Sequence, residues 1–288
     1  MKRIKQRLIY VYNTFRYPIR IASPLKTINE IQKGKSISRF GDGEFYLIFG
    51  QKECYQPYSD ALRKCLADVL SDSQHNEHCL ICLPYSLNRL FGLTDRSKDF
   101  WTDYQISHRK RIFDITSRRL QYYDAQITRL YINKKDKRVP MRFFARWKQL
   151  WAGKNVLIAE GSKTRFGMKN DLLDGASSIR RIVCPAEGAF EKIDLIEAAI
   201  RAESGFDLCL LALGPTASIL AYTLSQCGIQ AIDIGNLDIE YEWSLAKATV
   251  MTAVEGKYTC EAIDGSDGKN VTEADDPVYL SQVIKIIQ

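Results

Sequence analysis

Four short apolar runs in the second half of the chain alternate with stretches of helical composition, and this pattern restricts the fold more than any other feature. The runs cover residues 155–159, 181–184, 207–213 and 230–234. Each is apolar nearly throughout, which is typical of strands buried on both faces rather than on one. Helices are predicted between them, at about 190–202 and from 215 to about 226. The pattern therefore predicts an α/β fold with a mostly parallel sheet flanked by helices.

The first half of the chain shows the same kinds of element with weaker signals. Ser23 and Pro24 predict a helix start, and Gly34 predicts its end. Strands are predicted at 36–40 and 79–83, with a helix over 61–70 between them. Residues 97–150 are rich in helix formers and in Lys and Arg, and 127–132 is interpreted as a strand within this helical, basic insertion. We predict two parts: a segment of residues 1–24 and one domain over 25–288.

Composition excludes several classes of protein. The 288 residues are 45% hydrophobic and 11% aromatic, which a disordered chain would not be. No apolar run reaches the roughly 20 residues that a membrane-spanning helix needs. Eight cysteines without an export signal favour reduced thiols and a cytoplasmic location.

The first 29 residues carry seven Lys and Arg and no acidic residue. Within them Ile4, Leu8, Val11 and Phe15 recur at helical spacing, which fits an amphipathic helix at an anionic membrane surface. The same spacing fits a helix that packs on its own domain, and both interpretations stay open. Residues 30–288 are neutral overall, so we expect no nucleic-acid partner and a peripheral membrane contact, if any, through residues 1–20.

Candidate chemistry lies where the predicted strands end, because parallel sheets bind ligands beyond the carboxyl ends of their strands. Asp42 and Glu44 follow the first strand and flank a glycine. Two carboxylates so placed can hold a hard divalent cation, although Asp-Gly is also a common turn. A zinc site from His75 to Cys82 is disfavoured because a strand over 79–83 would point its two cysteines to opposite faces.

Three later strand ends also carry polar residues. Residues 160–171 are rich in hydrogen-bond donors but lack the spacing of a phosphate-binding loop. Residues 214–216 open a helix whose free N–H groups favour an anion. Residues 238–243 hold three acidic and two aromatic residues. One of the three carboxylates could accept a proton from a hydroxyl. Each also has an ordinary structural interpretation as a helix start or a polar loop.

Four segments, taken together and in this order, resemble the GT-D-type glycosyltransferases, a family of Asp-x-Glu glucosyltransferases formerly described as a domain of unknown function. They are residues 37–44 (ISRFGDGE), 160–171 (EGSKTRFGMKND), 213–217 (LGPTA) and 230–243 (QAIDIGNLDIEYEW). The resemblance implies a Rossmann-like fold. It also implies transfer of a hexose, typically glucose, from a UDP-sugar to a hydroxyl of a glycan in cell-envelope, capsule or glycoprotein synthesis.

The resemblance also implies roles for individual residues. Asp42 and Glu44 would bind manganese or magnesium, and Glu242, with Glu240 second, would be the general base. Asn236 stands where histidine is expected in relatives. The nucleotide would be lined by Arg39, Gly41, Glu160, Gly161, Thr164, Arg165, Asn170, Asp171, Gly214, Pro215 and Thr216.

Two other function classes stay open on sequence alone. One is a non-catalytic module that binds a nucleotide or an anion at the membrane surface. The other is a Rossmann-type oxidoreductase or methyltransferase, which the lack of a glycine-rich dinucleotide motif disfavours.

Overall fold

A single sheet of eight strands organises the computed structural model, which describes residues 2–52, 56–72, 77–259, 261–262 and 276–288. Its order is β3-β2-β1-β7-β6-β4-β5-β8, and every neighbouring pair is parallel. The predicted α/β fold with a parallel sheet is confirmed. The strands are β1 (Ser36–Arg39), β2 (Cys79–Leu83), β3 (Tyr123–Asp124), β4 (Asn155–Gly161), β5 (Ser178–Cys184), β6 (Leu208–Ala212), β7 (Ala231–Asp233) and β8 (Val283–Ile286).

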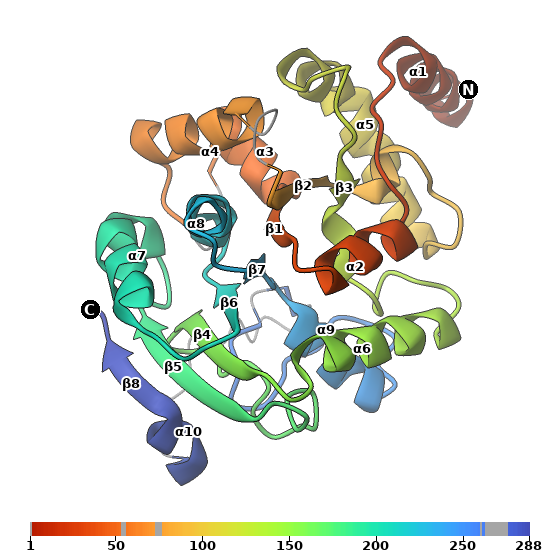
Figure 1. The fold of residues 1–288 in the computed structure, drawn as a ribbon. Coiled ribbons are helices and arrows are strands. Elements are labelled where there is room, and N and C mark those ends of the chain that lie inside the picture. The colour runs from red at the N-terminus through yellow and green to blue at the C-terminus, as the bar shows by residue number, and fades with distance from the viewer. Residues whose placement is uncertain (1, 53–55, 73–76, 260, 263–275) are drawn as a thin grey trace.

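Helices cover both faces of the sheet (Figure 1). Helices α3, α4, α7 and α8 lie on one face, and α2, α6 and α9 lie on the other. The helices are α1 (Lys2–Arg16), α2 (Pro24–Gln32), α3 (Asp42–Ile48), α4 (Asp60–Asp72), α5 (Asp95–Ile115), α6 (Arg138–Trp151), α7 (Ile193–Ala202), α8 (Pro215–Gln226), α9 (Leu237–Leu245) and α10 (Pro277–Gln282), with short 3-10 helices η2 (Tyr85–Leu87), η3 (Ala125–Thr128) and η4 (Ala189–Lys192).

Local sequence explains several of these boundaries. Ser23 caps α2 by accepting a hydrogen bond from the backbone N–H of Lys26, and Pro24 occupies the first turn, where its missing N–H costs nothing. Gly34 follows the helix with a φ of +98°. Strands β2 and β6, which each have a neighbouring strand on both sides, are buried along their whole length, as their apolar runs predict.

The predicted strand at 127–132 is wrong. Residues 125–128 form η3, and the N–H groups of Tyr131 and Ile132 donate to Oε2 of Glu240, at 2.6 and 2.8 Å. The carboxylate of Glu240, from α9, thus accepts the hydrogen bonds that a neighbouring strand would otherwise accept. The apolar side chains of residues 127–132 are buried in the core. The short strand β3 precedes this run, and β8 at the other sheet edge was not predicted.

The basic region 97–150 is helical at both ends, through α5 and α6, but it is not a separate insertion. It contributes β3 and η3 to one end of the sheet, and α6 packs on α2. Arg109 of α5 is buried and donates to the carbonyl oxygens of Tyr17 and Leu87. This side chain ties α5 to the segment that follows α1.

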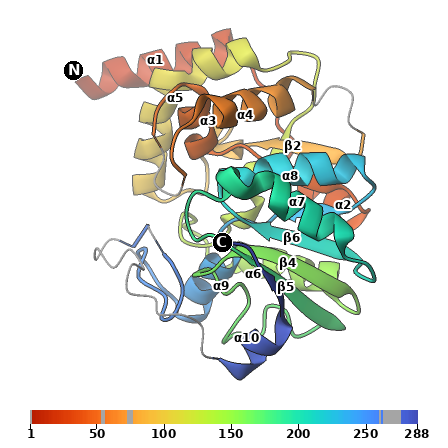
Figure 2. The same ribbon diagram turned by 90° about the vertical axis from the view of Figure 1, so that its left-hand side faces the viewer.

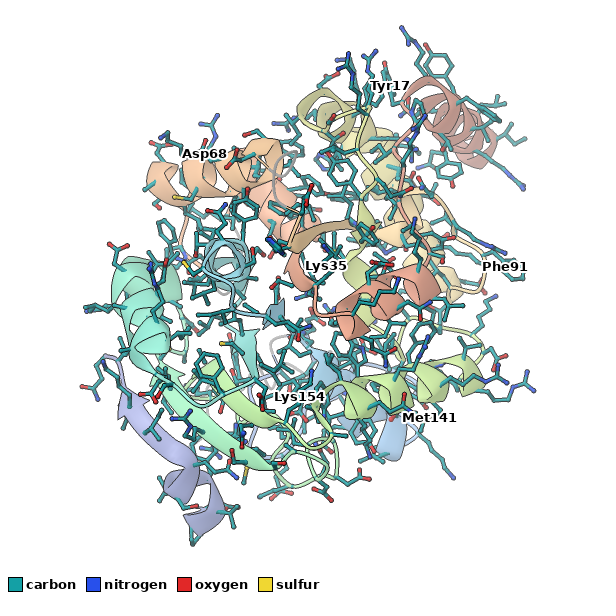
Figure 3. The ribbon with its side chains drawn as sticks, viewed as in Figure 1. Tyr17, Lys35, Asp68, Phe91, Met141 and Lys154 are labelled. Carbon is teal, nitrogen blue, oxygen red and sulfur yellow. The ribbon has the colours of Figure 1, made fainter. Side chains whose placement is uncertain are left out.

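Helix α1 lies along α5 at the outside of the molecule (Figure 2). The predicted helix in this segment is confirmed, and Tyr17 beyond its end packs on Phe113 of α5, with ring centroids 5.4 Å apart (Figure 3). Among the described residues, no helix has the length and apolar character to cross a membrane.

Candidate active site

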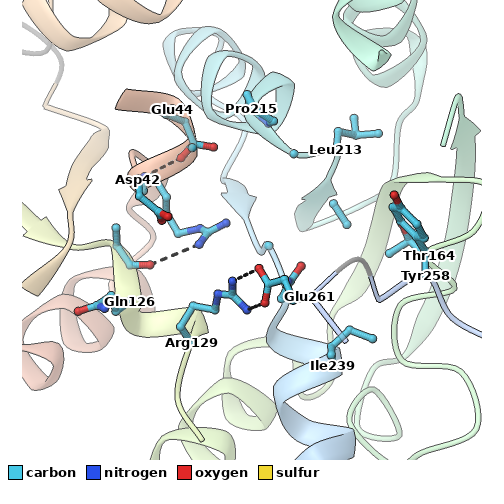
Figure 4. A pocket seen from close by; sticks show the side chains of 18 of the residues that line it. Asp42, Glu44, Gln126, Arg129, Thr164, Leu213, Pro215, Ile239, Tyr258 and Glu261 are labelled. Atoms are coloured by element: carbon cyan, nitrogen blue, oxygen red, sulfur yellow. Dashed lines mark hydrogen bonds and ion pairs between the residues drawn. The ribbon is translucent and has the colours of Figure 1, made fainter. Parts of the chain in front are cut away.

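A cleft of about 430 Å³ opens at the carboxyl ends of the strands. Residues that follow β1, β3, β4, β5, β6 and β7 all contribute to its walls, and the first turns of α5 close one side. Asp42, Glu44 and Pro215 lie on its upper side in Figure 4, and Arg129 and Glu261 lie below them. The cleft is therefore where the strand topology predicts a ligand.

Asp42 and Glu44 form one wall at the start of α3. The N–H of Gly41 donates to Oε2 of Glu44 at 2.6 Å, which fixes this carboxylate at the helix N-terminus. Burial, and secondly the nearby charge of Asp233, raise the pKa of Glu44 to about 7. Glu44 is thus partly protonated at neutral pH, and a bound cation would have to displace that proton.

The turn between β6 and α8 forms the opposite part of the cleft. Gly214 has a φ of +55°, a conformation that favours glycine, and Pro215 fills the first position of the twelve-residue helix α8. Both residues line the cleft, so the positive end of this helix faces it. Thr216 does not, because its buried hydroxyl donates to Oε1 of Gln56 at 3.4 Å.

Arg39 lines the cleft, but most of its guanidinium is bound to protein. Its Nη2 donates to Oδ1 of Asp233 at 2.7 Å, and its Nε donates to the carbonyl of Asp233 at 2.8 Å. Gly235 passes over this guanidinium so closely that a Cβ there would lie 2.1 Å from Nη2. Arg39 therefore joins β1 to β7 beneath the cleft and contributes positive charge to its floor.

The loop after β4 is divided between cleft and core. Gly161 and Thr164 line the cleft. Glu160 does not, and this corrects its predicted role: its buried carboxylate accepts hydrogen bonds from Arg181 at 2.5 Å and from the N–H of Phe166 at 2.7 Å.

Three further residues predicted to bind the nucleotide do not line the cleft. Asn170 donates to Asp238 and Glu242, both at 2.7 Å, and Asp171 pairs with Lys148 at 2.6 Å. Arg165 has a φ of +48° and its Nη1 lies beside Gly256. The polar side chains of this loop thus contact neighbouring segments of the protein.

The acidic segment of α9 also differs from the prediction. Glu240 is fully buried and accepts the two N–H groups of the 131–132 backbone, and Glu242 accepts from Asn170 and from Lys257 at 2.8 Å. Neither carboxylate lines the cleft. This corrects the placement of the fully buried Glu240, whereas the role predicted for the partly exposed Glu242 stays a prediction. Asp238 does line it, with its Oδ2 2.6 Å from Nζ of Lys257.

Several cleft residues were not predicted from the sequence. Gln126 and Arg129 come from η3 and the residue after it, and Arg129 forms a two-point ion pair with Glu261 across the opening (Figure 4). Phe100 and Trp101 come from the second turn of α5. The signal that could reveal Gln126 and Arg129 is that they follow a strand directly, but that strand is β3 at Tyr123–Asp124 and not the predicted strand at 127–132.

The donor set at Asp42 and Glu44 fits a hard cation that brings further oxygen ligands with it. Among the described residues, no group of three or more His, Cys, Asp or Glu could hold a metal by itself. Two carboxylates leave most positions of an octahedral ion to phosphate oxygens and water. His75 of the disfavoured zinc site lies outside the described residues, and Cys79 and Cys82 are buried in β2.

Comparison with known proteins agrees with this architecture. Residues 37–262 match the family model described as "Glycosyltransferase GT-D fold". The chain is 38% identical over 254 residues to a probable glycosyl transferase Gly of Streptococcus gordonii and 34% identical to glycosyltransferase GlyD of Streptococcus pneumoniae. Each alignment covers 88% of this chain but only 36% and 31% of those proteins, so the chain spans about a third of their length.

Solved structures match over nearly the whole chain. One is described as a new glycosyltransferase from Streptococcus sanguinis, with a TM-score of 0.87, 35% identity and coverage of 94% of this chain and 100% of that one. Another is described as the highly conserved domain of unknown function 1792, with a distinct glycosyltransferase fold. It has a TM-score of 0.90 and 32% identity and covers 97% of this chain and 100% of that one. The chain therefore belongs to the family of glycosyltransferases with the GT-D fold.

Proposed function

We propose that this protein transfers a hexose, with glucose the expected sugar, from a UDP-sugar to a hydroxyl group of a glycan acceptor, with a divalent cation. One observation carries the proposal. The carboxylates of Asp42 and Glu44 and the N-terminus of α8 at Gly214 and Pro215 line the same cleft. A diphosphate could therefore contact the positive helix end while a cation held by the two carboxylates binds its oxygens.

The cation, when bound, would neutralise the charge that develops on the departing diphosphate. The protein would add fixed dipoles and charges in a partly enclosed site. The positive end of α8, at Gly214 and Pro215, would face a phosphate oxygen, and the guanidinium of Arg39 would add positive potential from the floor. The cleft would also hold donor and acceptor together, which lowers the entropic cost of their reaction.

The acceptor hydroxyl needs a base, and we assign this role to Asp238. Of the three acids in the segment 238–242, Asp238 is the one that lines the cleft. Burial raises the pKa of its carboxyl, which favours proton uptake, although the ammonium of Lys257 opposes this shift. Hydrogen bonds from Asn170 and Lys257 fix the carboxylate in one orientation.

Thermal unfolding with UDP tests the nucleotide and cation assignments. We expect UDP with manganese, at about 100 times its dissociation constant, to raise the midpoint by about 5 °C, and UDP alone to raise it less. Asp42→Asn and Glu44→Gln should remove the part that depends on manganese. The control Asp60→Asn, at the exposed start of α4, should respond like the wild type.

Two results would contradict this assignment. Equal stabilisation by UDP in the wild type and both cleft variants would remove Asp42 and Glu44 as cation ligands. Stabilisation by NAD or S-adenosylmethionine in place of UDP would favour the oxidoreductase or methyltransferase class. Release of UDP from a panel of UDP-sugars then tests turnover. Tight UDP binding with no turnover of any sugar would favour the non-catalytic binding module.

A further inference from the structure

Helix α1 presents its apolar stripe to solvent. The exposed fractions of Ile4, Leu8 and Phe15 are 67%, 66% and 82%, and Val11 is 42% exposed. A helix that packs on its own domain buries such a stripe, because burial of each large apolar side chain is favourable. Helix α1 instead turns its apolar stripe toward solvent and a more polar face toward the domain.

The opposite face of α1 contacts α5 through polar groups. Nδ2 of Asn13 donates to the carbonyl oxygens of Gln105 and Ile106, at 3.5 and 3.4 Å. Nε2 of Gln6 donates to Oδ1 of Asp103 at 3.3 Å. These contacts, with the packing of Tyr17 on α5, hold α1 in register along its neighbour (Figure 2).

The spacing along the helix separates the two faces. The outer stripe is residues 4, 8, 11 and 15, and the inner stripe is residues 6, 10, 13 and 17. The two stripes have the same intervals and differ by two residues, which is a rotation of about 200° around the helix. The apolar stripe therefore points almost directly away from the domain.

Charge on the same segment indicates what covers the stripe. Arg7 and Arg16 are exposed and lie on opposite sides of it, about 60° before and about 120° beyond Ile4 on the helical wheel. Arg20 is exposed just beyond the helix, and residues 1–29 contain no acid. Apolar side chains flanked by bases fit a surface with an apolar interior and negative headgroups. A second copy docked through the same face would bring these arginines together and repel.

We propose that α1 is an interfacial helix that docks this protein on an anionic lipid membrane. Ile4, Leu8, Val11 and Phe15 enter the boundary between headgroups and acyl chains, and Arg7, Arg16 and Arg20 contact the phosphates. The proposal rests on α1 and its contacts with α5, and it is independent of the ligand of the cleft.

Flotation with lipid vesicles tests the proposal on the whole chain. We expect the wild type to bind vesicles of phosphatidylcholine with phosphatidylglycerol and to bind phosphatidylcholine alone weakly. Leu8→Ser with Phe15→Ser should lower partition to the anionic vesicles by about tenfold or more per side chain. Arg7→Gln with Arg16→Gln should lower it by about fivefold per arginine and reduce its dependence on salt.

A matched control separates docking from general surface hydrophobicity. Phe91→Ser with Leu195→Ser removes two apolar side chains that are 81% and 57% exposed elsewhere on the surface, and Figure 3 shows Phe91 at the periphery. This variant should bind vesicles like the wild type. Both serine variants should keep the wild-type unfolding temperature, because the replaced side chains are exposed.

Three outcomes would overturn the proposal. The wild type could fail to bind anionic vesicles, or the Leu8 and Phe15 variant could bind them as well as the wild type does. The third is a dimer of the wild type in light scattering without lipid that the same variant converts to a monomer. That result would assign the stripe to a second copy of the chain.

Discussion

Asp238 occupies an unusual position for a buried carboxylate, since it faces a cleft on one side and an internal cation on the other. Lys257, only 3% exposed, lies within 2.6 Å of Asp238 and 2.8 Å of Glu242, and Asn170 donates to both acids. Glu242 therefore shares the charge of Lys257 and limits how strongly that ammonium stabilises ionised Asp238. In our proposal Glu242 is a positioning residue and Asp238 is the base.

Kinetics of two variants distinguish these roles. Asp238→Asn should lower kcat by about 10²-fold or more while leaving the affinity for UDP within about twofold, because the amide cannot accept the acceptor proton. Glu242→Gln should lower kcat less and should shift the pH profile of kcat, since it changes the charge next to Lys257 without removing the base. A larger loss of kcat in Glu242→Gln than in Asp238→Asn would reverse the assignment.

Strands β4 and β5 are joined by an ion pair inside the sheet as well as by their backbone ladder. Arg181 and Glu160 are both buried, and Arg181 also donates to the carbonyl of Phe166, in the loop that carries Thr164 to the cleft. A buried ion pair adds little net stability over an apolar pair, but the loss of one partner leaves an unpaired charge in the core.

Denaturant unfolding measures how much more it costs to remove one partner of the pair than to replace both. Glu160→Ala should lower the free energy of unfolding by about 3–5 kcal/mol. Glu203→Ala, which removes the partly exposed partner of Arg180 on the same strand, should cost under about 1 kcal/mol. Glu160→Met with Arg181→Met should recover most of the loss. Equal losses of unfolding free energy in Glu160→Ala and Glu203→Ala would show that the buried pair contributes no more to stability than the partly exposed pair.

At the scale of single elements, the sequence predicts a helix or strand correctly where a short local stretch determines its type and boundaries. The apolar runs of β2, β4 and β6 need both faces covered, and Ser23 with Pro24 suffices to start α2. The strand assigned to 127–132 failed because the partner of its N–H groups, Glu240, is more than a hundred residues away. Long-range partners of this kind leave no local pattern.

The same limit applies to the candidate site. The sequence predicts that Asp42, Glu44, Gly214 and Pro215 line the cleft, because each belongs to a turn at the end of a strand. Glu160, near the end of β4, and Glu240, in the first turn of α9, are glutamates like Glu44. Their carboxylates nevertheless bind groups that are distant in the sequence. Sequence identifies which strand ends meet, but the rotation of each side chain toward cleft or core depends on the whole packed molecule.

Over the whole molecule, stability depends on a carboxylate where several elements meet. Asp124 at the end of β3 is 2% exposed and accepts hydrogen bonds from the N–H groups of Tyr85 and Gln126. Burial raises its pKa from 3.8 to about 6, although Lys134 and these hydrogen bonds oppose the shift. Between those two pH values the folded protein binds more protons than the unfolded chain, so Asp124 makes stability fall as pH rises from about 4 to 6.

Asp124→Asn should remove the loss of stability that ionisation of Asp124 causes as the pH rises. The amide oxygen can still accept both N–H groups, and no charge is buried at high pH. The variant should match the wild type at pH 4 and exceed its free energy of unfolding by about 2 kcal/mol at pH 7. The exposed control Asp99→Asn should show no such difference. A variant that is less stable than the wild type at pH 7 would mean that the ionised form is the favoured one in the fold.

Strand β7 joins β1, from the start of the chain, to β6, from its second half. During translation a ribosome delivers β1, β2 and β3 first and β4, β5 and β6 later, and the sheet stays in two pieces until residues 231–233 emerge. Until then one edge of β1 and one edge of β6 have unpaired backbone N–H and C=O groups, which can pair with strands of other chains. A message cut short before this point would yield strands on both sides of the gap and no completed cleft, so residues 231–233 must be synthesised before a ligand can bind.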